Sequence, residues 1–185
     1  MKRRNFAKLT AISSLIGFAP IQTFSKSLNN ESDIKISLAQ WSLNKSIKSG
    51  ELPILDFAKK ARSFDINAIE YVASLYTEHS DVLDRMPMSS LAKELLKRSD
   101  DYGIDNFLFM IDGQGDLASS RKRIRLEAIE NHKRWIDFSF EIGCKTMRVN
   151  LRGEDNLDRW TENSVKSLSV LSNYNKDLNV VVENH

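Results

Sequence analysis

Three polar residues that could carry chemistry stand together at the end of the printed sequence. The segment Leu178–Val182 contains three consecutive valines, which predicts a buried strand, and Glu183, Asn184 and His185 follow it directly. A carboxylate and an imidazole can bind a divalent metal ion or move a proton. Residues two apart in a strand share a face, so Glu183 and His185 are expected to point the same way. A structural role also stays open for Glu183, as a helix cap or as the partner of a lysine.

The elements that must position these residues alternate regularly along the chain. Apolar runs predict strands over Ile34–Trp41, Ile66–Ala73, Ile104–Ile111 and Cys144–Leu151, and a fifth strand from Leu178. Helices are predicted from Pro53 to Phe64, from Ser89 to Gly103, after the loop Asp112–Asp116 to about Gly143, and over Leu157–Tyr174. The third helix is expected to bury one face made by Leu126, Ile129, Ile136 and Phe140, and Ser74–Pro87 is expected to be a loop.

Regular alternation of strand and helix predicts an α/β protein with parallel strands and helical crossovers. Two architectures fit this pattern. One is a five-stranded doubly wound sheet, and the other is a (β/α)₈ TIM barrel, which typically needs ~250 residues. The residues after position 25 provide about the first four and a half βα units of such a barrel.

Polar residues collect where the predicted strands end, and both architectures bind ligands there. Arg148 and Asn150 share a face near the end of the fourth strand. Asp112 directly follows the third strand, and His79 lies in the predicted loop after the second. These four residues are therefore candidates for binding a substrate.

Several segments resemble the xylose isomerase-like TIM barrel superfamily of sugar phosphate isomerases and epimerases. Val181–His185 resembles the fifth-strand signature of that superfamily, and Trp41-Ser42-Leu43 is similar to its opening strand. Glu70-Tyr71 resembles the second strand, and Ile142–Asn150 resembles the passage from helix to fourth strand. The resemblance covers residues 34–185 and implies the N-terminal half of such a barrel.

The resemblance also implies an activity and roles for individual residues. In that superfamily the glutamate that ends strand five binds a divalent metal ion and takes part in proton transfer, a role that falls on Glu183. His185 would lie beside the substrate or the metal, and Asp112 would lie in a loop on the substrate side. The implied reaction is isomerisation or epimerisation of a small sugar or sugar derivative by proton transfer next to a carbonyl, or by a hydride shift. The implied cofactor is Mn, Mg, Zn or Co, and its other ligands come from strands six to eight, beyond His185. The resemblance therefore implies an isomerase or epimerase activity for the full-length protein, and residues 1–185 are expected to be inactive alone.

The N-terminal segment Met1–Ser25 reads as an export signal, followed by a polar linker over residues 26–33. Lys2-Arg3-Arg4 precedes an apolar stretch that is shorter than the ~20 residues needed to span a bilayer. Arg3-Arg4-Asn5-Phe6-Ala7-Lys8 resembles the twin-arginine signal, which implies export of a folded protein to the periplasm. No membrane association is expected once the signal is removed.

The charge and cysteine content exclude some classes of partner. The first 25 residues hold four basic and no acidic residues, so the remainder has a formal net charge of −2. A domain so close to neutrality is not built to bind nucleic acid through bulk charge. Cys144 is the single cysteine, which excludes an internal disulfide. A homo-oligomer is compatible with the sequence.

Other motifs admit competing interpretations. The segment from Gly113 to Ala118 fits a dinucleotide-binding glycine pattern, but Asp112 and Asp116 would repel a pyrophosphate. The basic run Arg121–Arg125 is expected to be a solvated helix face, and His132 a helix-packing residue. Two alternatives to the isomerase remain, namely a metal-dependent phosphodiesterase resembling the apurinic endonucleases and a non-catalytic sugar-binding barrel.

Overall fold

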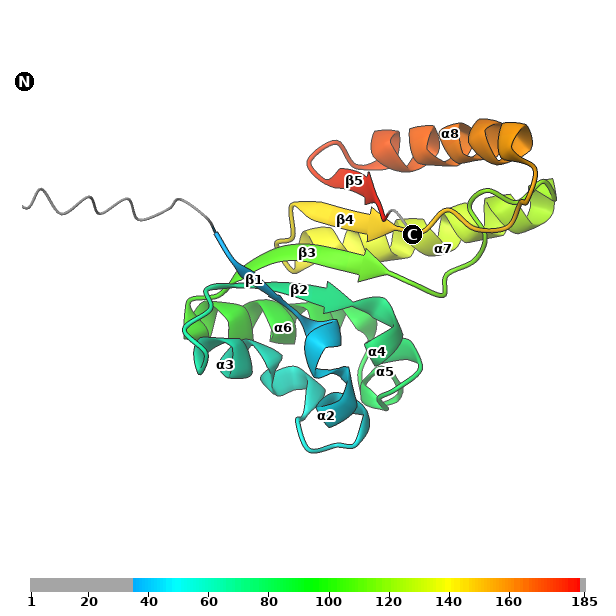
Figure 1. Cartoon of the computed structure of the whole chain (residues 1–185). Helices are drawn as coiled ribbons and strands as arrows, with labels where there is room; N and C mark the ends of the chain where they lie inside the picture. Colours follow the sequence, from blue (N-terminus) through cyan, green and yellow to red (C-terminus); the bar gives the residue numbers. More distant parts are fainter. Residues whose placement is uncertain (1–34, 184–185) are drawn as a thin grey trace, which may run out of the picture. The chain divides into compact units, whose positions relative to one another are not determined.

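The computed structural model describes residues 35–183 of the chain, so the predicted signal, the linker, Asn184 and His185 lie outside the described residues. Five strands form one sheet in the order β1-β2-β3-β4-β5, and each neighbouring pair is parallel. The strands are β1 (Ser37–Ala39), β2 (Ala68–Val72), β3 (Asp105–Ile111), β4 (Thr146–Val149) and β5 (Asn179–Val182). Figure 1 shows β2, β3 and β4 as arrows that point the same way, with α6 and α7 beside them. The predicted α/β class with parallel strands is confirmed.

Helices connect each pair of neighbouring strands. The β1–β2 connection holds the 3₁₀ helix η1 (Gln40–Leu43), α2 (Asn44–Lys48), the 3₁₀ helix η2 (Ile54–Asp56) and α3 (Phe57–Arg62). The β2–β3 connection holds α4 (Ala73–Thr77), α5 (Val82–Arg85) and α6 (Met88–Tyr102). Single long helices, α7 (Lys122–Glu141) and α8 (Leu157–Tyr174), complete the last two crossovers. No helix within residues 35–183 is long and apolar enough to cross a membrane.

Local sequence signals explain where the long helices begin and end. Pro87 precedes α6, and Gly103 ends it in the left-handed conformation with φ of 61°. Asn156 caps α8, because its side-chain oxygen accepts a hydrogen bond of 3.1 Å from the backbone N–H of Arg159. These two helices therefore lie close to their predicted bounds.

Two predictions are wrong, one about secondary structure and one about the burial of side chains. The segment Ser74–Pro87 is not simply a loop, because it carries most of α4 and all of α5. These short helices are held by tertiary burial, with Leu75, Tyr76 and Val82 at most 1% exposed. Leu126 and Phe140 of α7 were expected in the core, but they are 49% and 46% exposed.

The strands bury alternate residues against the helices, which leaves the intervening residues on the opposite face. Tyr71, Phe109 and Met147 are at most 1% exposed. The Phe109 ring stacks on Tyr71 and Trp135 at centroid distances of 6.1 and 5.2 Å. Because strand side chains alternate, Glu70 and Arg148 lie on the other face of the sheet, which we call the inner face. This core fixes the register of the inner-face residues.

Candidate functional site

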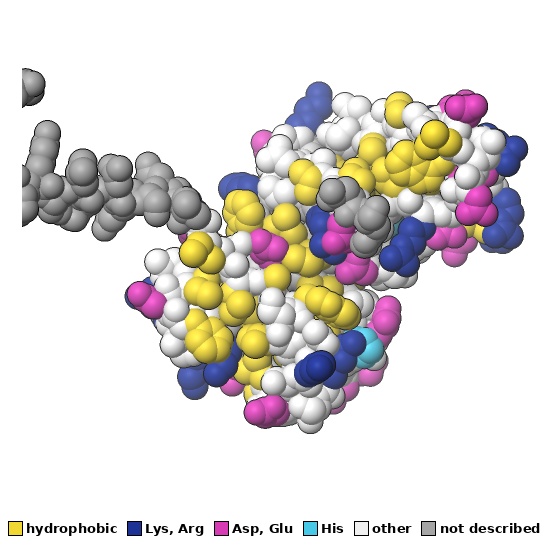
Figure 2. All heavy atoms as spheres, viewed as in Figure 1, with side chains coloured by type: hydrophobic (Ala, Val, Ile, Leu, Met, Phe, Trp, Pro, Cys, Tyr) yellow, Lys and Arg dark blue, Asp and Glu magenta, His cyan; other side chains and the backbone are white. Residues whose placement is uncertain are grey.

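The structure gathers four of the predicted site residues at the carboxyl end of the sheet. Asp112 follows β3, Glu183 follows β5, and Arg148 and Asn150 lie in and just beyond β4. All four line a cleft of about 760 Å³. Figure 2 shows acidic and basic side chains side by side where β4 and β5 end. The clustering follows from the parallel register, because β4 lies between β3 and β5.

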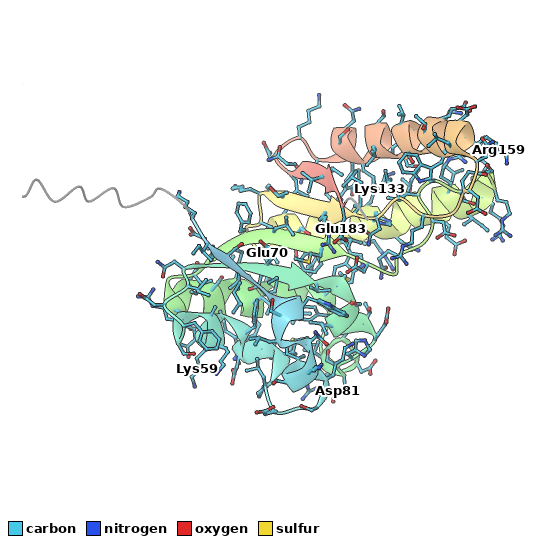
Figure 3. The ribbon with its side chains drawn as sticks, viewed as in Figure 1. Lys59, Glu70, Asp81, Lys133, Arg159 and Glu183 are labelled. Atoms are coloured by element: carbon cyan, nitrogen blue, oxygen red, sulfur yellow. The ribbon has the colours of Figure 1, made fainter. Side chains whose placement is uncertain are left out.

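Arg148 lies between the two carboxylates of this cluster. Its Nη1 is 2.9 Å from Glu183 Oε1, and its Nη2 is 3.5 Å from Asp112 Oδ1. Asn150 Nδ2 donates a hydrogen bond of 2.6 Å to the same Asp112 oxygen. The Arg148 side chain is 19% exposed and the Glu183 side chain 29%, so water screens their attraction only in part. Figure 3 shows Glu183 at the end of β5, over the sheet.

The hydrogen bonding of the Arg148 guanidinium is incomplete. Its Nε is buried and has no hydrogen-bond partner within the described part of the chain. The guanidinium therefore engages the two carboxylates through its Nη atoms alone. A buried donor without a partner costs about 1–3 kcal/mol, so Arg148 is held in place at some cost to stability.

The opposite walls of the cleft come from the chain after β1 and β2. Trp41 and Ser42 of η1 line one side, together with Glu78 after α4. Trp41 is 47% exposed, and Lys48 Nζ lies 4.8 Å from its ring centroid. This wall joins an aromatic surface to polar groups, a combination that is typical of small-molecule sites.

His132 also lines the cleft, which the sequence did not indicate. It is 2% exposed, and its Nδ1 lies 2.7 Å from the carbonyl oxygen of Ala128. Burial lowers the pKa of His132, which favours the neutral ring with Nδ1–H donating to that carbonyl. His132 is therefore a buried helix residue, as predicted, and it also forms part of the cleft wall.

His79 does not lie in this cluster. His79 lines a second cavity of about 490 Å³, and its Nε2 is 3.9 Å from Glu78 Oε2. His185 lies outside the described residues. The sequence did not single out Glu70 as a site residue; it lies on the inner face and accepts a hydrogen bond from Ser37. The substrate-binding roles of both histidines stay predictions.

Two loops are packed together to form the rim of the cleft. The loop after β3 donates from the Ala118 N–H to the Arg152 carbonyl in the loop after β4, at 2.9 Å. Ser167 of α8 donates to the Leu117 carbonyl at 2.6 Å. A Cβ at Gly115 would lie 2.9 Å from Ala128 Cβ. This glycine of the dinucleotide-like pattern therefore allows the loop to approach α7.

Glu154 anchors the second rim loop and gives the protein a pH-dependent element. It accepts hydrogen bonds from the Ser120 hydroxyl, the Asn156 backbone N–H and Arg159. These donors lower the pKa of Glu154 from 4.5 to about 2. Because the folded-state pKa is depressed, the stabilisation is full above pH 4.5 and is lost as the pH falls toward 2.

We therefore expect Glu154→Gln to lower the free energy of unfolding at pH 7, where the wild-type carboxylate is charged. The difference between variant and wild type should shrink at pH 3, because part of the wild-type stabilisation is lost there. Urea unfolding of both proteins at pH 7, 5, 4 and 3 measures this. A difference that is constant across the series would contradict the role given to Glu154.

The described residues do not by themselves fit a divalent metal ion. Within residues 35–183, no group of three or more His, Cys, Asp or Glu side chains could hold one. The carboxylates of Glu183 and Asp112 both contact the Arg148 guanidinium, which lies between them. This part of the chain thus offers Glu183 as a single ligand, already paired with a cation.

Comparison with known proteins gives a structural answer only. No family model matches the sequence, and no curated protein matches it. D-psicose 3-epimerase from Clostridium cellulolyticum H10, solved with D-tagatose, matches with a TM-score of 0.61 and 14% identity. The match covers 80% of this chain and 51% of that chain.

Two further solved structures are similar. A D-psicose 3-epimerase solved in the presence of D-fructose has a TM-score of 0.59 and 17% identity, over 82% of this chain and 55% of that one. The IolI protein with a bound zinc atom has a TM-score of 0.59 and 12% identity, over 80% and 51%. The chain spans about half the length of these structures. Its α/β fold is therefore that of about half of a TIM barrel.

Proposed function

We propose that the chain is part of a sugar isomerase or epimerase whose active site includes the cleft at the carboxyl ends of the strands. The carrying observation is the position of Glu183, on the inner face beside Arg148 and in a cleft with Asp112 and Asn150. Ligands bind at this end of the strands in TIM barrels. Similarity to the fold of sugar epimerases supports the proposal.

The chemistry proposed for this chain is proton transfer. Glu183 removes or returns the proton on the carbon next to the sugar carbonyl. Asn150 and Asp112 form hydrogen bonds with substrate hydroxyls, since they supply an amide donor and a carboxylate acceptor. Arg148 orients Glu183 through the 2.9 Å contact with its Oε1. The Trp41 ring covers an apolar face of the sugar and excludes water.

The charge of the cleft favours a sugar without a phosphate group. Its lining carries four carboxylates, from Glu78, Asp112, Asp116 and Glu183. Two guanidinium groups oppose them, from Arg148 and Arg152. Arg148 is already engaged by two of the carboxylates. A phosphate dianion would meet like charge here, whereas a neutral polyol would find hydrogen-bond acceptors.

A divalent metal ion, Mn, Mg, Zn or Co, is proposed as the cofactor of the complete site. Support comes from the zinc atom bound by the similar IolI structure. Glu183 would be one ligand, and the others would come from further βα units. When bound, such an ion polarises the carbonyl and hydroxyl oxygens of the sugar.

The proposal is tested on a protein that includes the further βα units, by incubating it with unphosphorylated ketohexoses and Mn²⁺ and following the products by NMR. Formation of an epimer or an aldose is expected, with sugar phosphates converted at least tenfold more slowly. If no ketohexose is converted but one binds, the alternative of a non-catalytic sugar-binding barrel applies. The Arg148–Glu183 ion pair specifically favours that alternative, because it neutralises the proposed base.

We also propose that residues 1–25 direct export to the periplasm by the twin-arginine route. The support is the basic start, the paired Arg3-Arg4 and the short apolar stretch that follows. A reporter fused to these residues is expected to reach the periplasm, and export should fail when both arginines are replaced by lysine, which keeps the charge. Cell fractionation measures the outcome. Equal export of the lysine variant would exclude this route.

A further inference from the structure

We propose that His132 is a specificity-determining residue of the cleft, whose Nε2 accepts a hydrogen bond from a hydroxyl group of the bound sugar. The inference rests on the proposed function, in which the cleft binds a sugar. It gives a role to a buried side chain that the proposed proton transfer does not use. The contact is made by the imidazole itself and requires no metal ion.

The loop after β3 brings the cleft to His132, in the middle of α7. Asn131 Nδ2 donates to the Gln114 carbonyl at 3.4 Å. Gly115 lies so close to Ala128 that an added Cβ would be 2.9 Å from the Ala128 Cβ. These two contacts hold the loop over the turn of α7 that precedes His132. Gln114, Gly115 and His132 all line the cleft, which therefore extends from the strand ends to the imidazole.

The two ring nitrogens of His132 have different roles. Nδ1 lies 2.7 Å from the Ala128 carbonyl oxygen, one helical turn earlier, and donates its proton there. Nε2 has no hydrogen-bond partner within residues 35–183, yet it is not one of the fully buried polar atoms that lack a partner. It is therefore accessible, and the cavity that His132 lines is the cleft. Because Nδ1 carries the proton, Nε2 is an acceptor.

Burial keeps this acceptor neutral, which decides the class of group that it binds. The His132 side chain is almost fully buried, and burial lowers its pKa, so the uncharged ring is favoured. A neutral acceptor binds a hydroxyl donor, whereas a phosphate dianion has no proton to donate to it. Asp116 of the same loop adds a second acceptor to the lining. This part of the cleft is therefore suited to a hydroxyl group.

The experiment uses calorimetry to measure the affinity for the D-ketohexoses and for the monodeoxy analogues of the one that binds most tightly. The protein includes the further βα units, and the conditions are those of the turnover assay. The wild type should bind one monodeoxy analogue about tenfold more weakly than the parent sugar, because Nε2 is then left without a donor. His132→Phe should bind the parent sugar and that analogue with equal affinity. For the other analogues, the ratio should be the same in both proteins.

His132→Gln and His132→Asn are a matched pair of variants. A glutamine amide reaches the place of Nε2 and supplies an acceptor, whereas an asparagine amide reaches only the place of Nδ1. The glutamine variant should therefore restore discrimination against the analogue, and the asparagine variant should not. Ser139→Ala controls for the loss of a side-chain hydrogen bond within α7. Ser139 is buried, donates to the Trp135 carbonyl at 2.6 Å and is not one of the described residues that line the cleft.

The outcomes separate this inference from the proposed function. If the wild type and His132→Phe discriminate equally against every analogue, the inference is overturned while sugar binding stands. If the sugar binds with the expected pattern but is not converted, the inference stands and the proposed isomerase activity falls. If no D-ketohexose binds, both fall. Circular dichroism establishes the fold of each variant, and the glutamine and asparagine pair decides alone if His132→Phe does not fold.

Discussion

Glu183→Gln is expected to lower the rate of sugar conversion by about 10²- to 10⁴-fold, the usual contribution of a general base. Glutamine keeps the shape of the side chain but cannot accept a proton. It also weakens the contact with Arg148 Nη1, which is 2.9 Å from Glu183 Oε1 in the wild type. The rate is measured with saturating ketohexose, so that loss of turnover is distinguished from loss of binding.

Glu162→Gln is the matched control for this substitution. Glu162 lies on the exposed side of α8 and pairs with Lys166 at 2.6 Å, outside the cleft. An exposed ion pair of this kind contributes about 0–1 kcal/mol, so turnover should be unchanged. If Glu183→Gln retained wild-type turnover, Glu183 would be removed from the catalytic site.

Gly153→Ala is expected to have the largest effect among substitutions at the rim of the cleft. Gly153 has a φ of 107°, and an added Cβ would lie 2.4 Å from Asp116 Cβ. The unfavourable backbone conformation alone costs on the order of 1–3 kcal/mol. Relief of the clash must also move Asp116, which lines the cleft. Both the melting temperature and the affinity for substrate should therefore fall.

Gly50→Ala separates the effect of backbone strain from the effect of the clash with Asp116. Gly50 also has a positive φ, of 77°, but an added Cβ would meet no atom within 4 Å. This variant should lower the melting temperature through backbone strain and leave KM unchanged. Calorimetric melting and steady-state kinetics of the two variants test the comparison. A wild-type KM for Gly153→Ala would show that the contact between the loops does not shape the cleft.

The sequence predicts the order of the elements well, because long elements carry periodic signals. The apolar spacing of α6 and the left-handed Gly103 define that helix without tertiary information. The helices α4 and α5 could not be predicted in the same way. They contain five and four residues, and they depend on burial of side chains such as Tyr76 against the core.

Part of the site also follows from the sequence. The alternation rule predicts that Arg148 and Asn150 share a face, and parallel strands bring Asp112 and Glu183 to the same edge. The sequence does not predict which of these side chains contact one another. Only the register shows that Arg148 lies between the two carboxylates.

The positions of His132 and His79 relative to the cleft could not be predicted from the sequence either. His132 lies on a long helix, and its burial pattern alone predicts a packing residue. It reaches the cleft because the loop after β3 folds over α7, a long-range contact without a local sequence signal. His79 follows a strand, but the short helices α4 and α5 place it in the second cavity.

The central claim is that Glu183 transfers a proton next to a sugar carbonyl, and deuterium incorporation tests it most directly. Wild-type protein and Glu183→Gln are incubated with Mn²⁺ and a ketohexose in D₂O, and the sugar is analysed by NMR. The account predicts deuterium at the carbon next to the carbonyl with the wild type and none above background with Glu183→Gln. Conversion without deuterium incorporation, or equal incorporation by both proteins, would contradict it.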